Sequence, residues 1–229
     1  MTGSLQAIIF DFDGVIADSE PLHLLAFQQA LAEDGIVLDR DAYLSRYLGF
    51  DDPGVFAALA RDRALPMDAQ RIRVLVARKG AKLQALLAGG HVLFPGAAAF
   101  IRDAAATVPV AIASGALRHE IVEIITAAGL APHFSTIVAS GDTPESKPSP
   151  APYQLAFKLI QEAAGRPLDP RRCVAIEDSA WGLESARGAG LRCVGVTTSY
   201  TADQLDAELI VEGLEALTIP VLERLCGTT

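Results

Sequence analysis

The sequence predicts an α/β protein in which a doubly wound parallel sheet is interrupted by an all-helical insert. The sheet is predicted because short apolar runs alternate with longer stretches of helical periodicity, and each run is apolar on successive residues. Such runs are typical of strands covered on both faces, and strands alternating with helices form parallel βαβ units. The insert is predicted because residues 19–90 carry no convincing strand signal. The predicted core is therefore Rossmann-like.

The predicted strands and the helices of the core follow one another along the chain. The strand signals are, in order, "AIIF", "VPVAIAS", "STIVAS", "RCVAIED", "RCVGVTT" and "ELIVEG". Helical periodicity covers residues 97–106, 117–128, 151–164 and 180–189. Two of these helices are predicted to end at a glycine, Gly129 and Gly190, because glycine readily adopts the left-handed conformation found at helix C-termini.

The insert is predicted to be a helical cap domain. Ser19 is a candidate N-cap, Pro21 suits a first turn, and the helical repeat continues to Gly35. Further helices are predicted at residues 52–64 and 68–88. The predicted domains are a discontinuous α/β core of residues 1–17 and 92–229 and a cap of residues 18–91. An insert placed directly after the first strand can cover the end of that strand like a lid.

Composition excludes several classes of function. The chain has 229 residues and a net charge of −9, with a pI of about 4.9, which argues against a nucleic-acid partner. We expect a cytoplasmic protein without a membrane partner, because the sequence has neither a signal-like N-terminus nor an apolar run of membrane-spanning length. A monomer is also expected. The cysteines Cys173, Cys193 and Cys226 are too scattered for a zinc site and odd in number, so we expect reduced thiols.

Polar residues follow four of the predicted strands. These residues are Asp11 and Asp13 after "AIIF", Ser114 and Gly115 after "VAIA", Lys147 after "TIVAS" and a short loop, and Glu177 and Asp178 after "CVAI". In an open parallel sheet, ligands bind beyond the carboxyl ends of the strands. All four groups fall on that edge, and the sequence therefore predicts one shared site there.

The acids of this edge predict a divalent cation. Close carboxylates repel one another unless a cation lies between them. A site with oxygen ligands only, of which few come from the protein and the others are waters, favours Mg²⁺ over Ca²⁺. Asp11 and Asp178 are the first candidates for ligands. Gly14 invites a turn, so Asp13 need not lie beside Asp11 and is allowed to bind the metal through its backbone carbonyl.

The remaining polar residues predict a phosphoryl group at the same edge. Ser114 offers a hydroxyl, and the amides of Gly115 and Ala116 are expected to open the next helix, whose N-terminus attracts anions. Lys147 supplies a compact positive charge. With Mg²⁺ present, Asp11 is predicted to attack the phosphorus and form an aspartyl phosphate. Asp13 is predicted to act as the general acid and then the general base.

The order of the motifs resembles that of a known family. "DFDGVIADSE", "ASGA", "SKPSP" and "EDSAWGLESARGAG" occur in the order found in the haloacid dehalogenase superfamily, in its branch of phosphatases and β-phosphoglucomutase-like enzymes with a helical cap. The resemblance covers almost the whole chain and implies the mechanism above. It implies Mg²⁺ on Asp11, the Asp13 carbonyl and Asp178, with Glu177 at or near the metal. In the cap it implies that His23 and Lys79 approach the substrate.

One departure from the mutase pattern indicates a phosphatase. The mutases carry an arginine three residues after a cap glycine, where it grips a second phosphate, whereas this chain has Asp52 three residues after Gly49. Arg46 is a candidate substitute. We therefore expect a phosphatase for a small phosphate monoester, such as a sugar phosphate. A sugar-phosphate mutase and a non-catalytic phosphate-binding module remain the alternatives, while Asp13 argues against dehalogenases and phosphonate-cleaving relatives.

Several of these residues also have a plainer structural interpretation. Asp11 and Asp13 would suit a solvated turn after a strand. Lys79 lies in the basic run "RKGAK", which is typical of a solvated helix face, and His23 could pack at the rim of a helix against Phe27. Trp181 is expected to pack beside the loop that carries Asp178.

Overall fold

The computed structural model describes residues 5–47, 50–87 and 92–227 and divides the chain into two compact units. The α/β unit comprises Met1–Asp18 and His91–Thr229, and the helical unit comprises Ser19–Gly90. Ala88 and His91, at which a helix and the cap were predicted to end, lie outside the described residues. Within those ranges, no helix combines the length and apolarity needed to cross a membrane.

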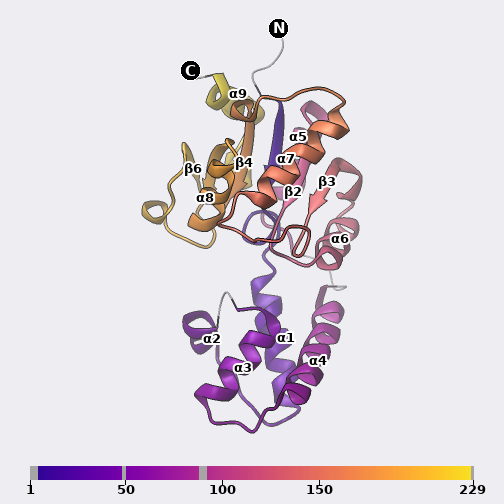
Figure 1. Cartoon of the computed structure of the whole chain (residues 1–229), viewed down its shortest axis with the longest axis vertical. Coiled ribbons are helices and arrows are strands. Elements are labelled where there is room, and N and C mark those ends of the chain that lie inside the picture. Colours follow the sequence, from indigo (N-terminus) through magenta and orange to yellow (C-terminus); the bar gives the residue numbers. More distant parts are fainter. Residues whose placement is uncertain (1–4, 48–49, 88–91, 228–229) are drawn as a thin grey trace. The chain divides into compact units, whose positions relative to one another are not determined.

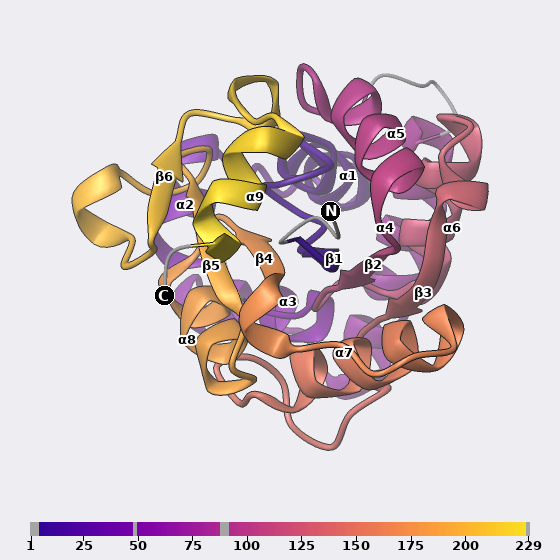
Figure 2. The ribbon, with the colours of Figure 1, turned by 90° about the horizontal axis from the view of Figure 1, so that it is seen from above.

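The α/β unit contains a parallel sheet (Figure 1), whose strand order β3-β2-β1-β4-β5-β6 can be followed from above (Figure 2). Its strands are β1 (Ala7–Phe10), β2 (Val110–Ala113), β3 (Phe134–Val138), β4 (Cys173–Glu177), β5 (Arg192–Val196) and β6 (Leu209–Val211). In the register of the sheet, Ile9 pairs with Ala111 on β2 and with Ala175 on β4. The first strand in sequence is thus central, and the predicted doubly wound fold is confirmed because the strand order reverses beside β1.

Helices cover both faces of this sheet, as the continuous apolar strands require. Viewed from above, α7 and α8 lie on one face and α5 and α9 on the other (Figure 2). The helices of the unit are α5 (Ala97–Thr107), α6 (Arg118–Ala127), α7 (Ala151–Ala164), α8 (Ala180–Gly188) and α9 (Ile219–Gly227). Its short 3-10 helices are η1 (Ala131–His133), η2 (Pro170–Arg172), η3 (Ala202–Gln204) and η4 (Leu214–Ala216). Of the α-helices, α9 was not predicted.

One core cluster determines how α7 and α8 pack on the sheet. Ile9 and Ala175 of the strands contact a buried group that includes Tyr153 of α7 and Leu183 of α8. Burying such apolar side chains contributes roughly 1.5–3 kcal/mol each. Tyr153 brings a hydroxyl group into this cluster. Because the side chain is buried, the hydroxyl needs a hydrogen-bond partner inside the unit.

The helical unit has its own core. Its helices are α1 (Glu20–Ala32), α2 (Arg40–Arg46), α3 (Asp52–Asp62) and α4 (Ala69–Leu87), of which α2 was not predicted. Phe27 of α1 contacts Tyr43 and Phe56 through tilted and edge-on rings, with centroids 5.7 and 5.2 Å away. Ser19 occupies the N-cap position of α1, but its side chain makes no capping hydrogen bond because its backbone is already helical. The expected N-cap position of Ser19 is confirmed, but the side-chain hydrogen bond of a cap is not formed.

Candidate active site

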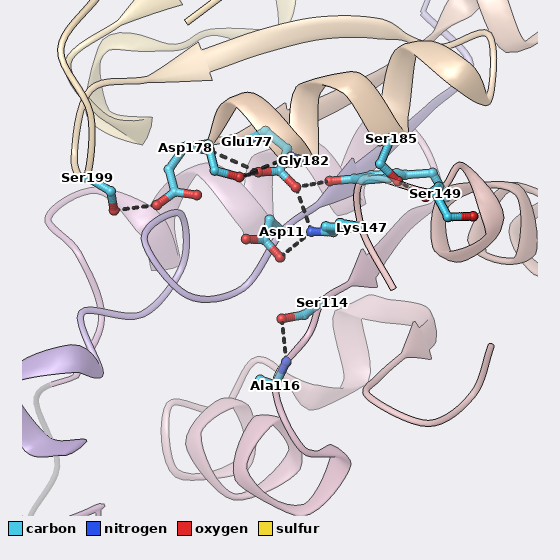
Figure 3. A network of polar contacts seen from close by, with 12 residues as sticks. Asp11, Ser114, Ala116, Lys147, Ser149, Glu177, Asp178, Gly182, Ser185 and Ser199 are labelled. Atoms are coloured by element: carbon cyan, nitrogen blue, oxygen red, sulfur yellow. Dashed lines mark hydrogen bonds and ion pairs between the residues drawn. The ribbon is translucent and has the colours of Figure 1, made fainter. Parts of the chain in front are cut away.

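The acids that follow β1 and β4 come together because these strands are parallel neighbours. Phe10 pairs with Ile176, so Asp11 and Glu177 emerge side by side at the carboxyl end of the sheet. Carboxylate oxygens of Asp11, Glu177 and Asp178 lie within 4.8 Å of one another, and all of these residues are buried. Figure 3 shows this acidic cluster from close by.

Lys147 enters the acidic cluster from the loop between β3 and α7. Its Nζ lies 2.7 Å from Asp11 Oδ1 and 2.5 Å from Glu177 Oε1, and its side chain is 14% exposed (Figure 3). The loop is tied to α8, because the buried Ser185 hydroxyl donates to the Ser149 carbonyl at 2.6 Å. Lys147 is therefore held within the acidic cluster and is not a surface lysine.

The Glu177 carboxylate is fully hydrogen-bonded. Oε1 accepts from Lys147 Nζ and, at 2.8 Å, from the Tyr153 hydroxyl. Oε2 accepts from the Asp178 amide at 3.2 Å and from the Ser179 hydroxyl at 3.1 Å. An ionised carboxylate offers about four acceptor positions, and these partners fill them. Glu177 therefore holds Lys147 in place and lies near the candidate metal position, with its lone pairs already engaged.

Two glycines let the chain approach these carboxylates closely. A Cβ on Gly182, in the first turn of α8, would lie 1.9–2.0 Å from the Glu177 carboxyl group. A Cβ on Gly14 would lie 1.8 Å from Asp178 Oδ2, and Gly14 also has a φ of +78°. Asp178 accepts a further hydrogen bond from the Ser199 hydroxyl. Both carboxylates are thus enclosed by neighbouring backbone, which limits their movement.

Asp13 is separated from the acidic cluster by the turn at Gly14. The Gly14 amide donates to the Ala17 carbonyl at 2.9 Å, and Asp13 forms an isolated bridge with Ala17. Among the residues that the structure describes, the Asp13 carboxylate is not part of the group formed by Asp11, Glu177 and Asp178. The turn that Gly14 was expected to make is present, and Asp13 is half-buried beyond it.

The electrostatics of the acidic cluster fit a hard divalent cation. Burial raises the pKa of Asp11 well above its usual range; the Lys147 charge opposes this rise, and Glu177 and Asp178 reinforce it. Burial is also the main cause that raises the pKa of Asp178 to about 6. Burial alone would lower the pKa of Lys147, but the charges of Asp11 and Glu177 raise it above its ordinary value. The cluster thus holds three carboxylates, of which two pair with the one ammonium, and this excess of oxygen donors and negative charge suits Mg²⁺.

The predicted phosphate-binding turn follows β2. Ser114 is buried, and its hydroxyl oxygen accepts the Ala116 amide at 3.1 Å (Figure 3). The first helical residue of α6 is Arg118, so Gly115 and Ala116 lie in the turn before the helix. The expectation that their amides open the helix is therefore wrong, because α6 begins two residues after Ala116, and the Ala116 amide is bonded to Ser114. The Ser114 hydroxyl still lies at the same sheet edge as Asp11.

A second polar cluster is buried within the helical unit. Lys79 is 1% exposed, and its Nζ lies 2.8 Å from Asp52 Oδ1 and 3.0 Å from His23 Nδ1. The ammonium also lies 4.9 Å from the centroid of the Phe27 ring. Lys79 is therefore not on a solvated helix face. Because an ammonium can only donate, His23 accepts through Nδ1 and carries its proton on Nε2.

The environment of His23 keeps the imidazole neutral. Burial and then the Lys79 charge lower its pKa to about 4, and the Asp52 charge opposes them. Asp52, the acid that replaces the expected arginine, is thus the ionic partner of Lys79. Arg46, the candidate substitute for that arginine, is exposed at the end of α2, and Gly49 lies outside the described residues.

Sequence reasoning missed several groups that complete these clusters. Tyr153 reads as one apolar position of an amphipathic helix, and nothing in its spacing indicates a bond to Glu177. Ser199 lies 21 positions from Asp178, so only the β4–β5 register reveals their contact. Ser179, by contrast, could have been found as the N-cap that directly follows the acids. Trp181 was expected to pack beside the Asp178 loop, but it is 65% exposed.

A buried acidic cluster with a paired lysine, at the carboxyl edge of a Rossmann-like sheet, defines a class of α/β hydrolases. The sequence model of the haloacid dehalogenase-like hydrolases matches residues 5–190, and the chain belongs to that family. The chain is 34% identical to protein CbbY of Rhodobacter capsulatus over 86% of its length and 87% of the relative's. It is 30% identical to a phosphoglycolate phosphatase of Yersinia pseudotuberculosis, over 86% and 83% of the two lengths.

A solved structure agrees with this assignment. A variant of CbbY from Rhodobacter sphaeroides, crystallised in complex with xylulose-(1,5)bisphosphate, is 30% identical to the chain and superposes with a TM-score of 0.77. The match covers 92% of this chain and 95% of that one. The resemblance identified from the motifs is therefore confirmed at the level of the family.

Proposed function

We propose that the protein is a Mg²⁺-dependent phosphatase that hydrolyses a small phosphate monoester through an aspartyl phosphate on Asp11. The observation that carries the proposal is the ion pair of 2.7 Å between Lys147 and Asp11 inside a buried acidic cluster. Asp11 in this position is suited to act as a nucleophile, because Lys147 can neutralise charge on the phosphoryl group that Asp11 attacks. A relative that is a phosphatase supports the same reaction class.

The proposed reaction has two steps. In the first, an Asp11 oxygen forms a bond to phosphorus while the bond from phosphorus to the ester oxygen breaks, and Asp13 gives its proton to the leaving alkoxide. Lys147 and the Ser114 hydroxyl donate to the phosphoryl oxygens. In the second step, Asp13 takes a proton from water as the water attacks phosphorus, which releases inorganic phosphate and restores the Asp11 carboxylate.

The oxygen atoms available at the site indicate which residues would hold the cation. We assign the side chains of Asp11 and Asp178 and the Asp13 carbonyl as ligands, with Glu177 beside them as the anchor of Lys147. When bound, Mg²⁺ supplies Lewis-acid stabilisation of the transferring phosphoryl group. Ser114 and the turn of Gly115 and Ala116 are proposed to orient that group.

The substrate is proposed to be a phosphorylated metabolite of the sugar type. A relative binds xylulose-(1,5)bisphosphate, so sugar phosphates and bisphosphates are the first compounds to test. We propose that His23 contributes to substrate selection as a neutral donor and that Lys79 fixes its orientation. Because Asp52 neutralises Lys79, the helical unit offers no net positive charge at this cluster, which favours monophosphates over bisphosphates.

A panel of phosphate esters, with and without a chelator, tests the proposed function. Hydrolysis that requires Mg²⁺ is expected for at least one sugar phosphate, and inactivity across the panel would favour the non-catalytic binding module. An Asp11→Asn variant should bind Mg²⁺ and inorganic phosphate but show no turnover. The matched control is Asp206→Asn, because Asp206 lies at the surface of the same unit with a side chain 90% exposed. Normal hydrolysis by Asp11→Asn would exclude Asp11 as the nucleophile.

Product analysis separates the phosphatase from the mutase. Glucose 1-phosphate with a trace of the bisphosphate should yield inorganic phosphate if the proposal is right. Efficient conversion to glucose 6-phosphate with little free phosphate would overturn it.

A further inference from the structure

Tyr153 contacts both partners of the ion pair between Lys147 and Glu177. Its hydroxyl donates at 2.8 Å to Glu177 Oε1, the same oxygen that accepts from Lys147 at 2.5 Å. Its ring centroid lies 5.0 Å from Lys147 Nζ, within the range of a cation–π interaction. Tyr153 is fully buried in the core cluster between α7 and the sheet. One rigid side chain thus contacts Glu177 through its hydroxyl and Lys147 through its ring.

The physical effect of Tyr153 is to restrict a flexible cation. A lysine loses about 1.5–2 kcal/mol of side-chain entropy when it is held in one rotamer, so a prearranged surface is needed to keep its ammonium in one place. The Tyr153 hydroxyl fixes the orientation of Glu177, whose other oxygen is held by Ser179 and the Asp178 amide. The Tyr153 ring, fixed by packing, lies beside the ammonium.

We propose that Tyr153 is a positioning residue for Lys147: its hydroxyl fixes the Glu177 oxygen on which the ammonium rests, and its ring limits where the ammonium can move. The kinetic consequence rests on the proposed phosphatase function, whereas the structural consequence does not. In the transition state Lys147 must meet the transferring oxygens while still in contact with Asp11, so loss of its fixed position should slow the chemical step more than it weakens substrate binding.

Two substitutions distinguish the contribution of the Tyr153 hydroxyl from that of the Tyr153 ring. Tyr153→Phe removes the hydroxyl and keeps the ring, and Tyr153→Leu removes both. The matched control is Tyr43→Phe, because Tyr43 is also buried and its hydroxyl donates to a carboxylate, that of Glu20, within the helical unit. This control loses an equivalent bond without touching Lys147.

The expected kinetic result is a graded loss in kcat. A hydrogen bond to a charged group supports a decrease of about tenfold in Tyr153→Phe, with KM within twofold of the wild type, and a larger decrease in Tyr153→Leu. Tyr43→Phe should lose comparable thermal stability and keep the wild-type kcat. The inference would be overturned if Tyr153→Phe kept the wild-type kcat, or if its KM rose while its kcat did not change. An equal decrease of kcat in Tyr43→Phe would also overturn it.

Crystal structures of the metal-free wild type and variants give a readout that does not depend on activity. In Tyr153→Leu, Lys147 should be displaced from Asp11 beyond ion-pair distance or occupy several rotamers. If that variant does not fold, the same comparison is made with Tyr153→Phe, in which alternate rotamers of Lys147 are expected. If Lys147 keeps both ion pairs in a single rotamer in the variant that is compared, the inference is overturned. A wild type that hydrolyses no ester refutes the proposed function, and the crystal structures then decide on Tyr153 alone.

Discussion

Gly182→Ala tests the enclosure of Glu177 by α8. A Cβ at this position would lie 1.9–2.0 Å from three atoms of the Glu177 carboxyl group, whereas real Cβ contacts are essentially never shorter than 3.0 Å. Either the carboxylate or the helix must therefore move by about 1 Å, which is enough to break hydrogen bonds of normal length. Movement of the carboxylate breaks its bonds to Lys147 and Tyr153, and movement of the helix breaks its N-cap at Ser179.

The size of the effect follows from the bonds at risk. Each hydrogen bond to a charged group contributes about 1.5–3 kcal/mol to the free energy of unfolding. Replacing glycine with alanine inside a helix raises that free energy by about 0.5–1 kcal/mol. With one or two bonds lost, Gly182→Ala should lower the free energy of unfolding by about 3 kcal/mol. In a chain of this length the thermal midpoint should then fall by roughly 6–12 °C. Because Lys147 loses its anchor, kcat should fall by about 100-fold.

Circular dichroism on heating and steady-state hydrolysis measure the two effects. Gly80→Ala is the matched control, because Gly80 lies within α4 and a Cβ there would meet nothing within 4 Å. That variant should be as stable as the wild type or slightly more stable, with unchanged kcat. A Gly182→Ala protein with the wild-type midpoint and kcat would refute the placement of the Glu177 carboxylate against α8.

Three further predictions concern Ser199 in the α/β unit and His23 and Asp52 in the helical unit. Ser199→Ala removes a hydrogen bond to Asp178, so the Mg²⁺ affinity should fall about tenfold in calorimetry; unchanged affinity would exclude Asp178 as a ligand oriented by Ser199. His23 has a pKa of about 4 in the folded protein and 6.5 ordinarily, so its contribution to stability is present above pH 6.5 and is lost as the pH falls towards 4. Between pH 7 and 4.5 the wild type should lose roughly 2 kcal/mol more than His23→Asn in urea unfolding, and equal losses would refute the neutral imidazole. Asp52→Asn leaves Lys79 buried without a carboxylate partner, which should lower the free energy of unfolding by about 2 kcal/mol; an unchanged value would show that the pair contributes nothing.

The sequence predicted most of the fold because its signals were local. Each strand of the sheet is a short apolar run, and α7 was predicted with its observed bounds, Ala151–Ala164. The missed helices have weaker local signals: α2 (Arg40–Arg46) is short and polar, and α9 (Ile219–Gly227) begins with an Ile-Pro pair. The expected helix start at Leu117 was one residue early, because that residue has extended backbone at the N-cap of α6.

The convergence of the site was predictable for a topological reason. Asp11, Lys147 and Glu177 are far apart in the chain, but parallel strands bring their carboxyl ends to one edge. The fine contacts were not predictable, because they depend on register and on side-chain rotamers. Nothing in the letters "RKGAK" indicates that Lys79 is buried against Phe27, since the same run suits an exposed helix face.

Lys79 and Lys147 differ in the balance of charge around their ammonium groups. Each ammonium lies about 5 Å from an aromatic ring and contacts at least one carboxylate. Around Lys79 the charges cancel, because one carboxylate and a neutral imidazole surround it, and such a pair stabilises the helical unit without attracting an ion. Near Lys147 lie three carboxylates and one cation; burial raises the pKa of Asp11, and the charges of Glu177 and Asp178 add to that rise. A fold tolerates this imbalance at a binding site, where a divalent cation can complete the charge, and for that reason we place the chemistry at Lys147 and not at Lys79.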